Sequence, residues 1–216
     1  MVSGGSSVTF LLTTSAGSNR LLLAHGMSDE VTVTGCTYNG DTVTQITASG
    51  NTRNWRLIAP DEGTNLSLTF TYSGYGGIWC GRTIWSGVDQ TTPLDAGTAN
   101  SGTSSAPTSG SISVPTDGAI WGSMWAAYTS SGTVTMSAGT SIYSVRNAGS
   151  GYSNGSGYRT TTGALTWSLP SSASWNVRAY KISPPPTPPP PTRKMRLFEG
   201  FKIKLINGKL KLLQKI

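Results

Sequence analysis

Residues 119–128 read AIWGSMWAAY and predict a β-strand that is apolar on both faces. Successive side chains of a strand point to opposite sides, so Trp121 and Trp125 share one face, opposite Ile120, Met124 and Tyr128. Residues 78–85, IWCGRTIW, repeat this pattern, with Trp79 and Trp85 opposite Ile78, Cys80 and Ile84. A sheet that is covered on both faces explains two strands of this kind.

Further strand-length segments, bounded by Gly, Asn, Asp and Ser, recur over the first 183 residues. The expected strands are 8–12, 20–24, 31–38, 42–48, 55–59, 66–72, 111–114, 133–137, 142–145, 164–169 and 175–182. Their spacing predicts an all-β fold, an antiparallel β-sandwich of jelly-roll type over residues 1–183. The Gly/Ser-rich segments 96–110 and 147–157 are expected to be long surface loops, because they are too polar for core strands.

The composition changes at Pro184, where the sandwich is expected to end. Residues 184–192, PPPTPPPPT, favour a polyproline II spacer of roughly 25 Å, at about 3.1 Å per residue. Residues 193–216 then form a separate element. Within it Asn207-Gly208 lies between two alternating segments, which is a strong signal for a two-residue hairpin loop that pairs Leu205 with Leu210.

This predicted hairpin has an apolar and a basic face. The apolar face carries Phe201, Ile203, Leu205, Leu210 and Leu212, and the basic face carries Lys202, Lys204, Lys209 and Lys211. A lone hairpin is marginal in water, so we expect it to be an anchor that docks on another chain or on copies of itself, and we expect a homo-oligomer. Folding back onto the sandwich and binding an anionic membrane or nucleic acid are alternatives. Specific nucleic-acid binding is not expected, because no aromatic residues interleave the lysines.

The formal net charge of +7 is confined to the tail. Residues 1–192 hold eight basic and eight acidic residues, whereas residues 193–216 hold eight basic residues against Glu199 alone. A polyanionic partner is therefore not indicated for the sandwich.

Titratable residues give little support for an enzyme, and no catalytic residue, metal or cofactor is expected. The single histidine, His25, follows an apolar segment and is expected to be a turn or core residue. Asp89 and Asp95 flank a turn and are expected to cap backbone amides, with calcium binding as the alternative. Cys36 and Cys80 favour two buried free thiols, and whether they pair with each other stays open.

The tryptophans have two interpretations. Core packing is preferred for Trp79, Trp85, Trp121 and Trp125, because both strands that carry them are apolar on both faces. The alternative is a platform on which sugar rings stack.

Three segments carry a family resemblance: residues 19–23 (NRLLL), 35–40 (GCTYNG) and 85–95 (WSGVDQTTPLD). Over residues 5–183 the chain resembles uncharacterised β-sandwich modules of tailed-phage structural proteins and bacterial surface proteins. The resemblance implies a displayed domain and transfers no catalytic residue.

The start of the chain, MVSGG, has no basic segment followed by an apolar one, which predicts synthesis in the host cytoplasm unless a signal has been removed. This start favours a virion over a cell wall. The expected function is a non-enzymatic virion surface protein, a phage capsid decoration protein anchored to a capsid or other virion protein. The alternatives are a glycan-binding adhesin or tail-associated module, and a hydrolase with a sandwich fold.

Overall fold

The computed structural model describes residues 7–28, 31–49, 52–74, 78–95, 97–127, 129–146, 151–186, 201–206 and 209–214. These residues form antiparallel sheets, which confirms the predicted all-β fold. None of them belongs to a helix that could cross a membrane. The chain divides into two units, Met1–Pro185 and Pro186–Ile216, and the division falls within the predicted spacer.

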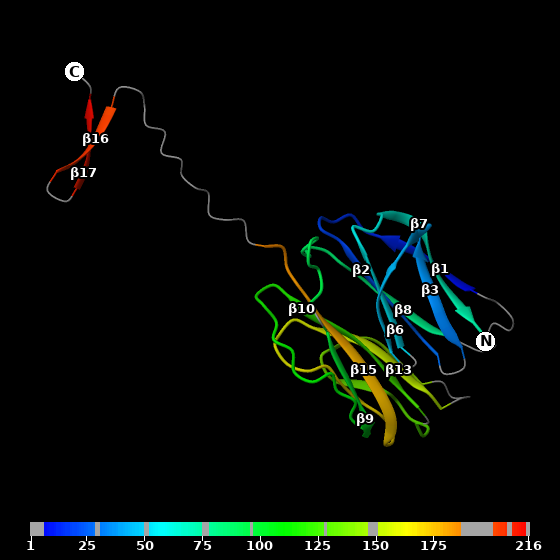
Figure 1. The fold of residues 1–216 in the computed structure, drawn as a ribbon. Helices are drawn as coiled ribbons and strands as arrows, with labels where there is room; N and C mark the ends of the chain where they lie inside the picture. Colours follow the sequence, from blue (N-terminus) through cyan, green and yellow to red (C-terminus); the bar gives the residue numbers. More distant parts are fainter. Residues whose placement is uncertain are drawn as a thin grey trace. The chain divides into compact units, whose positions relative to one another are not determined.

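Four sheets make up the first unit (Figure 1). Sheet A has the order β1(Ser7–Thr14), β7(Gly63–Ser73), β3(Thr32–Tyr38), β4(Asp41–Thr42). Sheet B has the order β5(Thr44–Ser49), β6(Thr52–Ile58), β2(Leu21–Met27), β8(Trp79–Trp85). Sheet C has the order β12(Thr140–Arg146), β13(Ser153–Arg159), β10(Ala119–Ala126), β15(Ala173–Ile182), β9(Thr98–Ser104). The small sheet D pairs β11(Thr135–Ala138) with β14(Thr166–Ser168).

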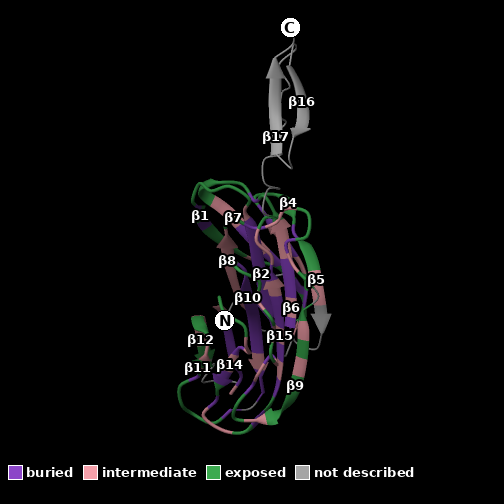
Figure 2. Cartoon of the chain, turned by 90° about the vertical axis from the view of Figure 1, so that its left-hand side faces the viewer, coloured by how far each residue is buried: buried purple, intermediate pink, exposed green. Residues whose placement is uncertain are grey.

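The sheets are stacked, so that the sandwich has more than one apolar layer. Leu22 of β2 packs with residues of sheet A such as Phe70, whereas Leu21 and Leu23 pack with Trp121 of sheet C. Every residue of β2 is buried, and Figure 2 shows β2 and β10 as the buried centre of the stack. Sheet B is therefore covered on both faces, which confirms the explanation given for the doubly apolar segments.

The predicted division of β10 into two faces is also confirmed. Trp121 lies in the layer between sheets B and C, whereas Ile120 and Met124 pack against Leu165 and Trp167 on the side of sheet D. Tyr128, the end of this predicted strand, lies outside the described residues. In β8 the same alternation places Ile84 toward sheet A and Trp85 toward sheet C.

Two segments that were expected to be loops contain strands, so that prediction was wrong in part. Residues 98–104 form the edge strand β9, and Ser153–Arg159 form β13, which lies between β12 and β10. The glycines of β13 make room for large neighbours: a Cβ on Gly155 would lie 2.5 Å from Nε1 of Trp167. Its serines find partners, since Ser156 donates a hydrogen bond to the carbonyl of Gly122 at 3.1 Å.

Two smaller predictions also need correction. Residues 111–114 form no strand, only a bridge between Ile112 and Gly163. Residues 42–48 are divided between β4 and β5, because Val43 leaves the strand and enters the core between sheets A and B.

We expect Gly155→Ala to lower the free energy of unfolding by roughly 1 to 3 kcal/mol, because the added methyl group overpacks the Trp167 ring. Gly17→Ala is the matched control, since its Cβ would meet Ser86 Cβ at 3.3 Å. Urea unfolding of both variants measures the difference. Equal losses in the two variants would contradict the role given to Gly155.

The second unit contains the hairpin of β16(Phe201–Ile206) and β17(Lys209–Gln214). Ile206 pairs with Lys209, Leu205 with Leu210, and Lys204 with Lys211. This register is the one predicted from Asn207-Gly208, and it is confirmed. Residues 207–208 themselves lie outside the described residues, as do residues 187–192 of the predicted polyproline spacer.

Candidate functional site

The hairpin is the first candidate interface, because its three central residue pairs each join residues of one kind. Along the ladder Leu205 is opposite Leu210 and Ile203 is opposite Leu212, while Lys204 is opposite Lys211. Like charges directly opposite each other weaken a strand pair, and a two-stranded hairpin is marginal even without them. A partner that covers the apolar positions would therefore stabilise this element.

The four tryptophans proposed for glycan stacking lie in the layer between sheets B and C or at its margin. Trp121 is 0% exposed and stacks on Tyr180, with ring centroids 6.0 Å apart. The glycan interpretation is wrong for Trp121, because this side chain has no exposed surface from which to contact a sugar.

The other three tryptophans are half-buried and do not form a single platform. Trp125 stacks on Tyr152 at 5.6 Å, and Trp79 lies 6.4 Å from the same ring. Trp85 instead meets Tyr158 edge to face at 5.4 Å, and its Nε1 donates a hydrogen bond to Thr83. Trp79 and Trp125 thus share Tyr152 as a neighbour, whereas Trp85 belongs to a different place on the surface.

His25 is fully buried, which confirms that it is a core residue. Its Nε2 lies 2.6 Å from the hydroxyl of Tyr143, and its ring lies against the β8 backbone, where a Cβ on Gly81 would be 2.5 Å away. Burial lowers the pKa of His25 to about 3. The imidazole is therefore neutral at neutral pH and enclosed, which makes proton exchange with a substrate difficult.

Cys36 and Cys80 are free thiols, which answers the question that the sequence left open; Cys36 is buried, whereas Cys80 is half-buried. Burial raises the pKa of Cys36 to about 12, and burial together with the nearby Cys36 raises the pKa of Cys80. Both side chains are consequently protonated at neutral pH and are weak nucleophiles.

Asp89 is a turn cap, which confirms the preferred interpretation for this residue. Its Oδ1 accepts hydrogen bonds from the backbone N–H groups of Thr91 at 2.7 Å and Thr92 at 3.2 Å. These bonds lower the pKa of Asp89. Asp95 forms an ion pair with Lys181 and is no backbone cap in the described bonds.

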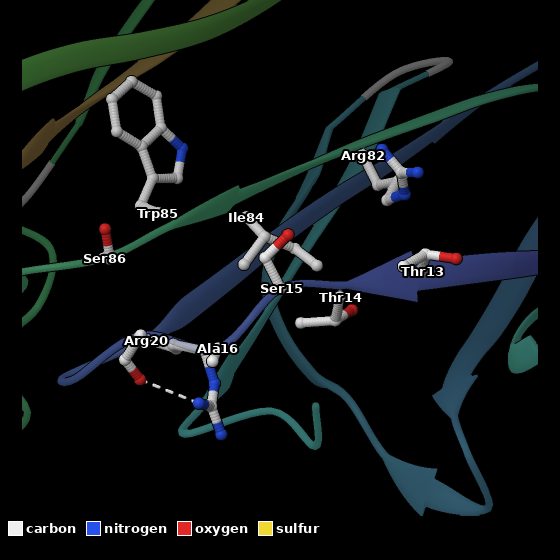
Figure 3. A pocket seen from close by; sticks show the side chains of 10 residues that line it. Thr13, Thr14, Ser15, Ala16, Arg20, Arg82, Ile84, Trp85 and Ser86 are labelled. Atoms are coloured by element: carbon white, nitrogen blue, oxygen red, sulfur yellow. Dashed lines mark hydrogen bonds between the residues drawn. The ribbon is translucent and has the colours of Figure 1, made fainter. Parts of the chain in front are cut away.

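A polar hollow beside β8 was not foreseen from the sequence. It has a volume of about 270 Å³ and is lined by residues 13–17, Arg20, Arg82, Ile84, Trp85 and Ser86 (Figure 3). Arg20 is held in place, because it donates hydrogen bonds to Glu62 at 2.8 Å and to the carbonyls of Gly17 and Pro60. The Nε atom of Arg82 is buried and has no hydrogen-bond partner among the described residues.

The sequence does contain a signal for this hollow. Period two places Arg82 on the face of residues 78–85 that otherwise carries Ile78, Cys80 and Ile84, all of which pack in the core between sheets A and B. A charged residue in such a row is costly to bury, so it indicates a site where the sheet edge opens.

Comparison of the chain with protein-family models, with curated proteins and with solved structures found no match. The functional proposals below therefore rest on the hairpin, on the core of the first unit and on the hollow beside β8.

Proposed function

We propose that the protein is a non-enzymatic virion surface protein, a phage capsid decoration protein that displays its β-sandwich and is anchored by its C-terminal hairpin. The observation that carries the proposal is that the buried core and the net charge lie in different parts of the chain. Residues 1–192 have no net charge and include a unit with its own buried core, whereas the whole charge of +7 lies in residues 193–216, the segment that contains the hairpin.

The hairpin supports an anchoring role, because its apolar positions need a cover. Burying one Leu or Ile side chain stabilises an interface by about 1.5 to 3 kcal/mol, and the register joins four such residues in two cross-strand pairs, Leu205 with Leu210 and Ile203 with Leu212. The partner in this proposal is a capsid or other virion protein, and several copies assemble on it after synthesis in the host cytoplasm.

The first unit supports a display role. His25 and both thiols are in states unsuited to catalysis at neutral pH, for the reasons given above. Within the described part of the chain, no three His, Cys, Asp or Glu side chains gather where they could hold a metal ion.

Deleting residues 193–216 should leave the sandwich folded and soluble but abolish its association with the particle, because the buried clusters of the described residues all lie in the first unit. Co-sedimentation with the particle measures association, and thermal unfolding of the truncated chain checks the fold. If the truncated protein is retained at the level of the full chain, the anchor is elsewhere and the proposal fails.

Glycan binding is the second candidate function. The half-buried pair Trp79 and Trp125 around Tyr152 favours it, since partly exposed aromatic faces can stack on sugar rings. The hollow beside β8 favours glycan binding as well.

A further inference from the structure

Arg82 occupies a position in β8 where burying a charged side chain costs free energy. Its neighbours on the same face of β8, Cys80 and Ile84, pack in the apolar layer between sheets A and B. The strand is the edge of sheet B, and β1 is the edge of sheet A, so the side chain reaches solvent between two edges. The Nε–H of Arg82 is buried without a partner, whereas the residue as a whole is only half-buried and lines the hollow. A negative charge beside the accessible part of the guanidinium would offset part of the cost of burying it.

The hollow has an arginine at each end and several hydroxyl-bearing residues in its lining. Figure 3 shows Arg82 at one end and Arg20 at the other, with Ser15 and Ile84 in the space between. The hydroxyl groups of Thr13, Ser15 and Ser86 can each donate and accept hydrogen bonds. Thr14 is already engaged, since its Oγ1 lies 2.6 Å from the hydroxyl of Tyr38.

The charged side chains at the hollow leave one positive charge without a counter-charge. Glu62 neutralises Arg20, whereas the ion pairs of the described residues do not include Arg82. A ligand with one negative charge and several hydroxyl groups matches this lining. The volume of about 270 Å³ lies just below the about 300 to 1,000 Å³ typical of drug-sized ligands, which suits a single sugar residue.

We propose that this hollow binds an acidic sugar residue, a uronic acid of a surface polysaccharide, with its carboxylate on Arg82 and its hydroxyl groups along Thr13, Ser15 and Ser86. The proposal deepens the glycan-binding candidate and does not depend on the hairpin anchor. It differs from stacking on Trp79 and Trp125 in requiring a negative charge on the sugar.

The test is a titration of the full chain with methyl glucuronide, followed by the NMR signals of the Arg82 Nε–H and of the backbone N–H of Ser15, which also lines the hollow. We expect saturable shifts of both signals, and binding of neutral methyl glucoside at least about tenfold weaker, because hydrogen bonds to charged groups are the stronger ones. Arg82→Gln should weaken uronide binding by a similar factor. Arg56→Gln, which removes the same charge at a different hollow, should leave it unchanged.

The basic tail attracts anions too, so Lys204→Gln with Lys211→Gln serves as a second control and should retain the Arg82 shift. Equal affinity for inorganic phosphate and the uronide, or equal affinity for the glucoside, would overturn the proposal. The proposal would also be overturned if the double variant Trp79→Ala with Trp125→Ala lost uronide binding and Arg82→Gln retained it. Glycan binding as a function would still stand in that case. If Arg82→Gln does not fold, the titration of the unsubstituted protein tests the site, because the absence of a shift in the Arg82 and Ser15 signals would refute it.

Discussion

Leu205→Asp combined with Leu210→Asp is expected to release the protein from its particle at every salt concentration. The two residues are paired across the hairpin, so the substitution places two like charges opposite each other in the apolar row. It also removes two leucines that the proposed interface would bury, worth about 1.5 to 3 kcal/mol each, which corresponds to a loss of affinity of more than about 100-fold. Co-sedimentation at low and high salt measures the release.

The matched control is Lys204→Gln combined with Lys211→Gln, a second pair that is directly opposite in the ladder. Removing two like charges should keep the hairpin intact and weaken attachment only mildly, because exposed ion pairs contribute about 0 to 1 kcal/mol. The difference in attachment between this variant and the unsubstituted protein should shrink as the ionic strength rises, because salt screens the charges of the unsubstituted protein. If the glutamine pair detaches the protein and the aspartate pair does not, the partner is a membrane or nucleic acid, and the anchor proposal fails.

Acid should destabilise the first unit in a pH range where carboxyl groups do not yet titrate. Burial lowers the pKa of His25 from 6.5 to about 3, so the unfolded chain binds a proton below pH 6.5 while the folded chain does not. Stability is therefore at its full value above pH 6.5 and is lost as the pH falls toward 3. The expected loss is about 1.4 kcal/mol per pH unit in this range.

Urea unfolding between about pH 4.5 and 6.5 isolates this effect, since carboxyl groups titrate near about pH 4. His25→Gln keeps a polar side chain beside Tyr143 and cannot take up a proton. It should lower stability at pH 7, because the stacked ring is lost, but it should flatten the pH dependence in this range. A slope equal to that of the unsubstituted protein would show that another group is responsible.

Several features were predictable from the sequence because they depend on neighbouring residues alone. Strand alternation divides β10 and β8 into their two faces, and the Asn-Gly turn sets the register of the hairpin. The concentration of charge after residue 192 follows from counting. Local rules suffice here, since side-chain direction and turn geometry are properties of a few consecutive residues.

Only the tertiary structure decided which polar segments are buried in the core and which aromatic side chains have no exposed surface. The first five residues of Ser153–Arg159 are buried, and the Trp167 ring occupies the space that a side chain at Gly155 would need. Trp121 is enclosed because sheet B covers sheet C, and Arg82 reaches a hollow because two sheet edges meet beside it. These outcomes depend on contacts between segments far apart in the sequence. The local patterns at Trp121 and Arg82 indicate a buried ring and an open sheet edge, but they do not say which distant segments lie beside these residues.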